Sequence, residues 1–180
     1  MDEVESTLPP FPKGGVLLKC MRALRDYYLP TNPEYTTTDV SEKIVKPWTE
    51  SKKYSLYELL KKDYADIPHP QLHLKACDAI TPHATVFVSH AWRYRFQDLV
   101  AALETFFDEN PTYKEETTFF WVDLFLNNQH TAPSLPFEWW SSVFREAISE
   151  IGHTCLVLNP WKSPIPLTRV WCLWVSLYDS

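Results

Sequence analysis

The chain has 180 residues, of which 45% are hydrophobic and 15% aromatic, so it is long enough for one buried core and too short to expect two. The formal net charge is -6, and no run of Lys or Arg lies among the aromatic residues. Nucleic acid is therefore not expected to be a partner. The acidic start has no apolar core like that of a secretory signal, and no apolar stretch is long enough to cross a bilayer. The four cysteines show no C-x-x-C spacing. Together these features predict a cytoplasmic protein that spans no membrane.

The N-terminal residues predict a tail followed by a helix. Residues 1–13 combine acidic side chains with three prolines, a composition typical of a disordered tail. Apolar residues then recur at helical spacing over residues 16–27, and the proline-containing sequence at residues 30–33 ends that helix.

Two further short helices are expected in this half of the chain. The first covers residues 40–46, with Asp39 and Glu42 as its capping box. The second follows Ser55, which forms a capping box with Glu58. Both are predicted to be amphipathic surface helices with their lysines in solvent.

Residues 67–83 carry three prolines and form the predicted boundary within the chain. Residues 14–83 are therefore expected to be an N-terminal helical extension. Residues 84–180 follow a different pattern and are expected to form a separate α/β unit.

Strands and helices alternate after this boundary. Short apolar runs predict three buried strands, and apolar residues at helical spacing predict the helices between them. The strands are at residues 85–89, 119–124 and 153–158, and the helices are at residues 96–107 and 140–151, the latter ending at Gly152. A third helix is expected after the proline-rich loop at residues 159–166. Consecutive β-α units indicate a three-layer α/β fold, with a parallel sheet between helices.

Ligands of such sheets bind outside the carboxyl ends of the strands. The residues there are 89–93, Asp123, the loop at residues 127–136, and residues 159–161. The first of these loops contains no glycine, so neither a Rossmann fingerprint nor a P-loop is present. A glycine-rich loop would therefore not hold a nucleotide here.

The residues at these strand ends have alternative interpretations. Trp92 could stack on a base or ribose while Arg93 pairs with a phosphate. Alternatively, Trp92 covers the sheet edge and Arg93 lies in solvent. Asp123 is either a loop-capping residue or a catalytic carboxylate, and capping is the commoner role. Ser89 and His90 are not expected to form a nucleophile–base pair, because neighbours on a strand point to opposite faces.

Three other residues have a spacing that could suit a metal site. His69, His73 and Cys77 lie four residues apart, a spacing that would align three zinc ligands on a helix. Prolines on both sides of His69 disfavour that helix, and no fourth ligand is evident, so neither a metal nor a cofactor is expected.

Four motifs, in this order, resemble those of a Toll/interleukin-1 receptor (TIR) domain. They are Val86-Phe87-Val88-Ser89-His90, Phe120-Trp121-Val122-Asp123, Cys155-Leu156-Val157-Leu158-Asn159-Pro160 and Arg169-x-Trp171-Cys172-Leu173. The resemblance covers residues 84–174, about half of the chain, and extends to TIR-like modules that often precede helical repeats in larger eukaryotic proteins. It implies a flavodoxin-like parallel sheet, of which about three strands are expected here.

The resemblance implies one of two roles. Many TIR domains associate with other TIR domains as adaptors in signalling of the innate-immune type, and others cleave the nicotinamide–ribose bond of NAD. The residues that it implies for substrate binding are Ser89, His90, Trp92, Arg93, Asp123 and Trp171. The loop that it implies for self-association or for binding other TIR-like domains contains Asn127, Asn128, Gln129 and His130.

Trp140 belongs to the core face of its helix, whereas Trp139 is expected to be exposed or at an interface. A small-molecule-binding domain without a TIR role is a third alternative.

Cleavage of NAD builds positive charge on the ribose, which a nearby carboxylate stabilises. In the enzymes of the family this group is a Glu four residues after the tryptophan, and the same count from Trp171 leads to Val175. Valine carries no charge and accepts no hydrogen bond, so the expected loss is at least ~10²- to 10⁴-fold. Asp179 lies ~6 Å further along the helix and is not expected to replace it. The resemblance thus implies an NAD nucleosidase that is inactive as the chain stands.

The C-terminal residues leave the TIR pattern at this same position. The fold normally has further strands after this helix, and Val175-Ser176 is the dipeptide that the splice-donor sequence GTGAGT encodes. We therefore expect residues 175–180 to be translated intron sequence or another artefact of gene prediction, and the intact protein to continue from Trp174 with Glu. The genomic sequence after codon 174 tests this.

Overall fold

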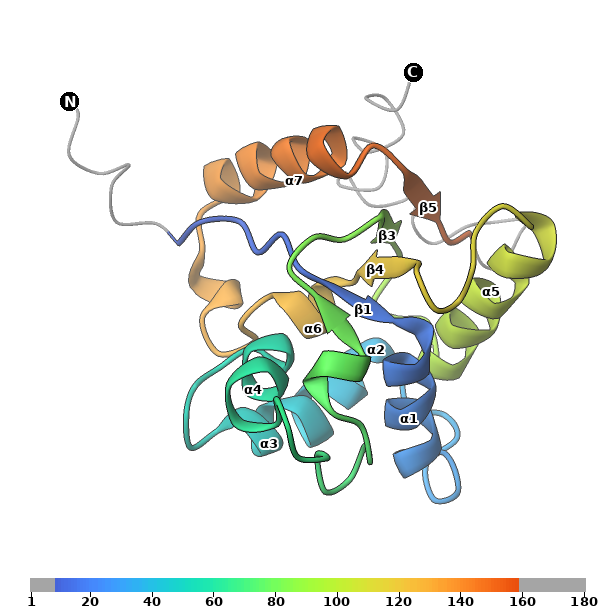
Figure 1. Cartoon of the computed structure of the whole chain (residues 1–180). Helices are drawn as coiled ribbons and strands as arrows, with labels where there is room; N and C mark the ends of the chain where they lie inside the picture. The colour runs from blue at the N-terminus through green and yellow to red at the C-terminus, as the bar shows by residue number, and fades with distance from the viewer. Residues whose placement is uncertain (1–8, 159–180) are drawn as a thin grey trace, which may run out of the picture.

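A five-stranded sheet crosses the part of the chain that the computed structural model describes, residues 9–158 (Figure 1). The strands are β1 (Gly15–Leu17), β2 (Ile80–Thr81), β3 (Val86–Ser89), β4 (Phe119–Trp121) and β5 (Thr154–Leu156), in the spatial order β2-β1-β4-β3-β5. β3 pairs in parallel with β4 and β5, whereas β1 pairs antiparallel with β2 and β4. Four strands therefore share one direction, and β1 runs against them.

The helices that follow β3 and β4 form the outer layers. They are α5 (Phe96–Glu109) and α7 (Phe137–Ile151). The chain passes from β3 to its neighbour β4 and then back across β3 to β5, so the two crossovers run in opposite directions. Because both crossovers are right-handed, their helices lie on opposite faces of the sheet. Figure 1 shows α7 along one side of the sheet and α5 beside α1 (Leu18–Tyr28) on the other. A three-layer α/β arrangement is therefore present.

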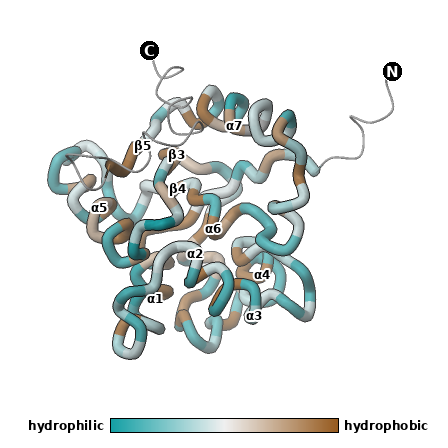
Figure 2. Tube along the Cα trace, turned by 180° about the vertical axis from the view of Figure 1, so that it is seen from behind, coloured by the Kyte–Doolittle hydropathy of each residue, from teal (hydrophilic) through white to brown (hydrophobic). Residues whose placement is uncertain are grey.

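Apolar periodicity explains how these layers pack. All four residues of β3 are buried, as expected for a central strand covered on both faces. α5 buries Phe96, Leu99, Val100 and Leu103. Figure 2 shows teal and brown alternating along α5 and α7, the pattern of helices with one apolar face. Gly152 ends α7 with a φ of 75°, in agreement with the predicted helix end.

The N-terminal half contains an irregular helical run. It consists of α2 (Thr37–Val40), the π-helical turn η2 (Ser41–Val45) and α3 (Lys46–Thr49). The sequence prediction of one helix at residues 40–46 was too short, and the capping box forms between Thr36 and Asp39 rather than between Asp39 and Glu42. The run continues through Pro47, because a proline in the first turn of α3 is compatible with helical geometry.

Other short elements complete the described chain. They are α4 (Leu56–Asp63), α6 (Asp123–Leu126) and the 3₁₀ turns η3 (Ala76–Asp78) and η4 (Ala132–Ser134). The predicted capping box of Ser55 and Glu58 is confirmed at the start of α4. The predicted strand at residues 119–124 was too long, since β4 ends at Trp121 and α6 begins two residues later. None of the helices within residues 9–158 is both long and apolar enough to cross a membrane.

The N-terminal segment is part of the same sheet, contrary to the expected helical extension with a three-stranded sheet after it. Residues 15–17 form β1, which lies between β2 and β4, so a segment expected to be helical from residue 16 begins as a strand. Gly15 permits the close approach, because a Cβ there would lie 2.9 Å from the Ala84 Cα and from the Phe119 Cβ. Three apolar residues fit either periodicity, and strand pairing decided between them.

The predicted disordered tail is also corrected over residues 9–13. The indole N–H of Trp139 donates to the carbonyl of Pro9, and that of Trp121 donates to the carbonyl of Pro12, both at 2.7 Å. Phe11 is buried and stacks on Trp121 with ring centroids 5.2 Å apart. We call residues 9–13 the N-terminal strap, because they pack along the core.

Candidate functional site

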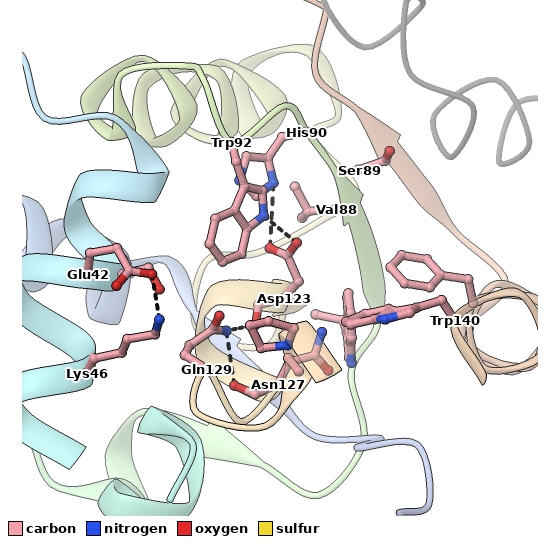
Figure 3. Close-up of a pocket in the computed structure, with 15 residues that line it drawn as sticks. Glu42, Lys46, Val88, Ser89, His90, Trp92, Asp123, Asn127, Gln129 and Trp140 are labelled. Atoms are coloured by element: carbon pink, nitrogen blue, oxygen red, sulfur yellow. Dashed lines mark hydrogen bonds and ion pairs between the residues drawn. The ribbon is translucent and has the colours of Figure 1, made fainter. Parts of the chain in front are cut away.

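A cavity of about 320 Å³ lies at the carboxyl ends of β3 and β4 (Figure 3). Its aromatic lining residues are Trp92, Trp121, Trp140 and Phe144, and its polar lining residues are Ser41, Glu42, Lys46, Ser89, His90, Asp123, Asn127 and Gln129. Val88, Ala132 and Pro133 complete the lining. The cavity thus has aromatic walls with polar groups between them, a combination typical of small-molecule sites.

Asp123 connects several parts of the cavity wall. Its Oδ2 accepts a hydrogen bond from Trp92 Nε1 at 2.5 Å, and its Oδ1 accepts one from the backbone N–H of Leu124 at 2.8 Å. The Nδ1 of His90 lies 4.0 Å from Oδ1, which is beyond hydrogen-bond distance. Both carboxylate oxygens therefore hold the surrounding wall, and α6 begins at Asp123 without a side-chain cap hydrogen bond.

Trp92 has a fixed position at the edge of the cavity. Its indole N–H is bound to Asp123, and its carbonyl accepts hydrogen bonds from the backbone N–H of Thr38 at 3.2 Å and from the Thr38 hydroxyl at 3.3 Å. Trp92 is half-buried and lines the cavity, whereas Arg93 is exposed and is not one of the lining residues. The structure thus brings Trp92, and not Arg93, to the predicted ligand position.

Ser89 and His90 are both buried and both line the cavity. Figure 3 shows His90 directed at Asp123 and Ser89 directed away from it, toward β5. This separation agrees with the alternation of side chains at a strand and does not support a nucleophile–base pair.

The predicted interaction loop turns its side chains inward. Asn127 and Gln129 are buried, and the Gln129 amide donates to the carbonyls of Asp123, Leu124 and Asn127 at 2.8, 3.3 and 3.1 Å. Hydrogen bonds also join Asn128 to the Lys53 carbonyl at 2.6 Å and His130 Nε2 to the Thr49 hydroxyl at 2.8 Å. The polar side chains of this loop therefore bond to backbone and hydroxyl groups next to it.

One wall of the cavity comes from residues that the sequence did not single out as a site. Ser41, Glu42 and Lys46 line the cavity, and Figure 3 shows Glu42 and Lys46 on the side opposite Trp140. Glu42 Oε1 accepts from Lys46 Nζ at 2.6 Å, one turn along the same helical run. A Glu–Lys pair at this spacing is typical of a solvated helix surface, so nothing local in the sequence indicated a cavity.

Of the two adjacent tryptophans of α7, Trp139 is buried rather than exposed, whereas Trp140 packs against the core as predicted. Trp139 is 6% exposed, with its indole N–H bound to Pro9, whereas the half-buried Trp140 lines the cavity. The helix rotates about 100° per residue, and the N-terminal strap covers the side that holds Trp139. The sequence of α7 alone did not indicate that a strap lies there.

His69 has a structural role in its loop. Its Nδ1 accepts hydrogen bonds from the backbone N–H groups of Gln71 and Leu72, both at 3.3 Å, and burial lowers its pKa to about 4. Across residues 9–158, no group of three or more His, Cys, Asp or Glu side chains is arranged to hold a metal ion. Trp171 and Val175 lie outside the residues that the structure describes.

The cavity therefore unites four of the predicted substrate-binding residues, which are Ser89, His90, Trp92 and Asp123. Comparison of the chain with models of protein families, with curated proteins and with solved structures found no match. The resemblance to TIR domains accordingly rests on the sequence motifs, two of which end at this cavity.

Proposed function

We propose that this chain is a TIR-like signalling module that binds NAD in the cavity at the ends of β3 and β4, and that it belongs to a family that hydrolyses the nicotinamide–ribose bond. One observation carries the proposal: Ser89, His90, Trp92 and Asp123 all line a single cavity. Ser89, His90 and Asp123 belong to two motifs of the resemblance about 30 positions apart, and Trp92 follows the first of these motifs by two positions.

The strand order supports a flavodoxin-like, and hence TIR-like, arrangement. β3, β4 and β5 are the first, second and third strands of the parallel part, and they lie in the order second, first, third. This order is the beginning of the flavodoxin-like order 2-1-3-4-5, in which ligands bind beside the first strand at the point where the order reverses. The cavity lies at the carboxyl end of that strand.

The chemistry of the cavity suits one half of NAD. A volume of about 320 Å³ is at the lower end for small-molecule sites, which favours a nicotinamide riboside moiety over the whole dinucleotide. The nicotinamide ring of NAD carries a positive charge, and tryptophan faces such as those of Trp92 and Trp140 attract cations. The carboxylates of Glu42 and Asp123 contribute negative charge at the same cavity.

The proposed chain binds NAD but cleaves it slowly. Val175 occupies the position that the resemblance assigns to the catalytic Glu, and a missing group of this kind lowers rates by about 10²- to 10⁴-fold. We place the protein in the cytoplasm, which agrees with Cys20, Cys77 and Cys155 being free thiols.

Titration with NAD, followed by calorimetry and by nicotinamide release, tests the proposal. We expect NAD to bind the full chain, and Trp140→Leu to weaken binding about ten-fold through loss of a stacking surface. Phe137→Leu, on the same helix but outside the cavity, is the matched control and is expected to leave the affinity unchanged. Val175→Glu is expected to increase nicotinamide release.

The alternative role is self-association without catalysis. It predicts no NAD binding to the full chain, no nicotinamide release from Val175→Glu, and an increase in mass with concentration in sedimentation experiments. That combination of results would remove the NAD proposal in favour of an adaptor.

A further inference from the structure

We infer that the wall formed by Ser41 and Glu42 is a subsite for the vicinal hydroxyls of a ribose, and that Glu42 is the carboxylate that contacts them. The inference rests on the proposed binding of NAD, which it makes more specific. It assigns a ligand contact to the N-terminal half of the chain, outside every motif of the TIR resemblance.

The backbone places these residues in an unusual way. Ser41 and Glu42 begin the five-residue π-helical turn η2, and both line the cavity although they are consecutive. π-Helical turns are rare and are frequent at functional sites, where the extra residue redirects side chains. Here the turn supplies two neighbouring oxygen-bearing side chains to one wall.

Ser41 has a polar group that lacks a partner within the described chain. The residue is 0% exposed, and among residues 9–158 its hydroxyl oxygen makes no hydrogen bond. A buried hydroxyl in this state is unfavourable, and most such groups in folded proteins are bonded. A ligand hydroxyl in the cavity would give it both a donor and an acceptor.

The two carboxylates of the cavity differ in the acceptors that they offer. Both oxygens of Asp123 accept hydrogen bonds from the wall, from Trp92 and from the Leu124 backbone. Glu42 is 54% exposed at its side chain, and in the described residues only its Oε1 has a partner, which is Lys46. Glu42 is therefore the carboxylate of the cavity that has an oxygen without a hydrogen bond within residues 9–158.

A ribose fits these groups better than a phosphate does. An ionised carboxylate accepts from two neighbouring hydroxyls, and an acidic residue binds ribose hydroxyls in this way in dinucleotide-binding folds. The same carboxylate repels a phosphate, and Lys46 is already paired with it. Trp140 lies on the opposite side of the cavity (Figure 3), and the ring centroid of Phe144 is 5.6 Å from that of Trp140, so the two provide flat apolar surface for the ring attached to the sugar.

Deoxy analogues of the ligand test the subsite. The full chain is titrated with NAD and with the two NAD analogues that lack the 2′-hydroxyl of the nicotinamide ribose or of the adenosine ribose. We expect the analogue that lacks the 2′-hydroxyl of the nicotinamide ribose, the half of NAD that the cavity favours, to bind about ten-fold more weakly than NAD. In Glu42→Gln, NAD is expected to bind about ten-fold more weakly, and the difference between NAD and that analogue is expected to disappear.

Two further variants separate binding from structure. Glu146→Gln is the matched control, because Glu146 is 55% exposed and has Lys13 at 3.9 Å but lies outside the cavity. It should preserve both affinities and their ratio. Ser41→Ala should weaken NAD binding several-fold without lowering the urea midpoint of unfolding, because the hydroxyl has no partner to lose in the described chain.

The outcomes distinguish this inference from the proposed function. If the wild-type chain binds NAD and Glu42→Gln retains the full discrimination against the deoxy analogue, the ribose subsite is wrong and NAD binding stands. If the wild-type chain does not bind NAD, the proposed function is wrong. The affinities of the chain for adenosine and for 2′-deoxyadenosine are then compared to test the subsite by itself. Loss of their discrimination in Glu42→Gln supports it, and equal binding of the two nucleosides to wild type overturns it.

Discussion

The hydrogen bond between Trp92 and Asp123 joins the ends of two neighbouring strands, in addition to the pairing of β3 with β4. It connects residues 31 positions apart at 2.5 Å and holds a tryptophan ring at the cavity edge. Because the acceptor is a carboxylate, the bond belongs to the stronger, charge-assisted class. Its function at the residue scale is to position Trp92 rather than to react.

Removal of this donor should therefore destabilise the fold. Trp92→Phe is expected to lower the free energy of unfolding by about 1.5–3 kcal/mol, the range for hydrogen bonds to charged groups. Urea denaturation measures the change. Trp48→Phe is the control, because in the described residues the Trp48 indole N–H has no hydrogen bond. Equal losses in the two variants would contradict a specific role for the bond.

His69 predicts how stability depends on pH. Burial, and to a smaller extent the charge of His73, lowers the pKa of His69 from 6.5 to about 4. The ring contacts Trp48 and Tyr64 with centroids 5.0 and 4.6 Å away, and this apolar surrounding disfavours the charged form.

Between pH 6.5 and 4, the unfolded chain binds a proton at His69 that the folded chain does not bind. The contribution of His69 is thus fully present above pH 6.5 and is lost as the pH falls toward 4, by up to about 3 kcal/mol. His69→Asn retains an acceptor for the loop and should reduce this slope in urea denaturation at several pH values. A slope like that of the wild type would refute the assignment, and His83→Asn, at an exposed position, is the control.

At the scale of elements, the N-terminal strap fastens α7 to the sheet. Pro9 accepts from Trp139 in the first turn of α7, and Lys13 Nζ pairs with Glu150 in its last turn at 2.7 Å. Between these ends, Phe11 stacks on Trp121, which also lines the cavity. The strap therefore supports the helix that carries Trp140 and the strand that ends at the cavity.

Phe11→Ala should loosen this support. We expect a loss of about 3–5 kcal/mol in the free energy of unfolding, because a buried aromatic side chain is removed from a packed site. A red shift of tryptophan emission should accompany it as Trp121 gains solvent. Pro10→Ala, at an exposed position of the same strap, should change neither quantity by a comparable amount. An unshifted emission spectrum in Phe11→Ala would contradict the stacking on Trp121.

At the scale of the molecule, the two halves of the chain form one sheet across residues 9–158. β1 and β2 come from the first half, and β1 pairs with β4 from the second. Ion pairs also cross the boundary, from Arg22 on α1 to Glu104 on α5 at 2.7 Å and to Glu115. The cavity has the same dual origin, since Glu42 and Asp123 belong to different halves.

A fragment of residues 84–180 should therefore not fold by itself. It lacks β1 and α1, so it would expose the edge of β4 and the apolar face of α5 to solvent. We expect no cooperative urea transition and few protected amides in hydrogen exchange, with the full chain as reference. A cooperative transition in the fragment would restore the interpretation of residues 14–83 as a separate extension.

The signals that the sequence carried correctly are local ones. The apolar runs of β3 and β5, the helical periodicity of α5 and α7, the Ser55–Glu58 box and the end of α7 at Gly152 all depend on neighbours within a few positions. Motif resemblance added Ser89, His90, Trp92 and Asp123, which meet at one cavity. Local periodicity and cap chemistry are expressed in the chain itself, so they can be read without the fold.

Tertiary structure alone decided the remaining features. Residues 15–17 are a strand because β2 and β4 pair with them, and Trp139 is buried because the strap covers it. Glu42 reached the cavity because a π-helical turn packs beside a loop that is about 80 residues away in sequence. Each of these outcomes depends on a partner distant in the chain, and no local pattern specifies which partner that will be.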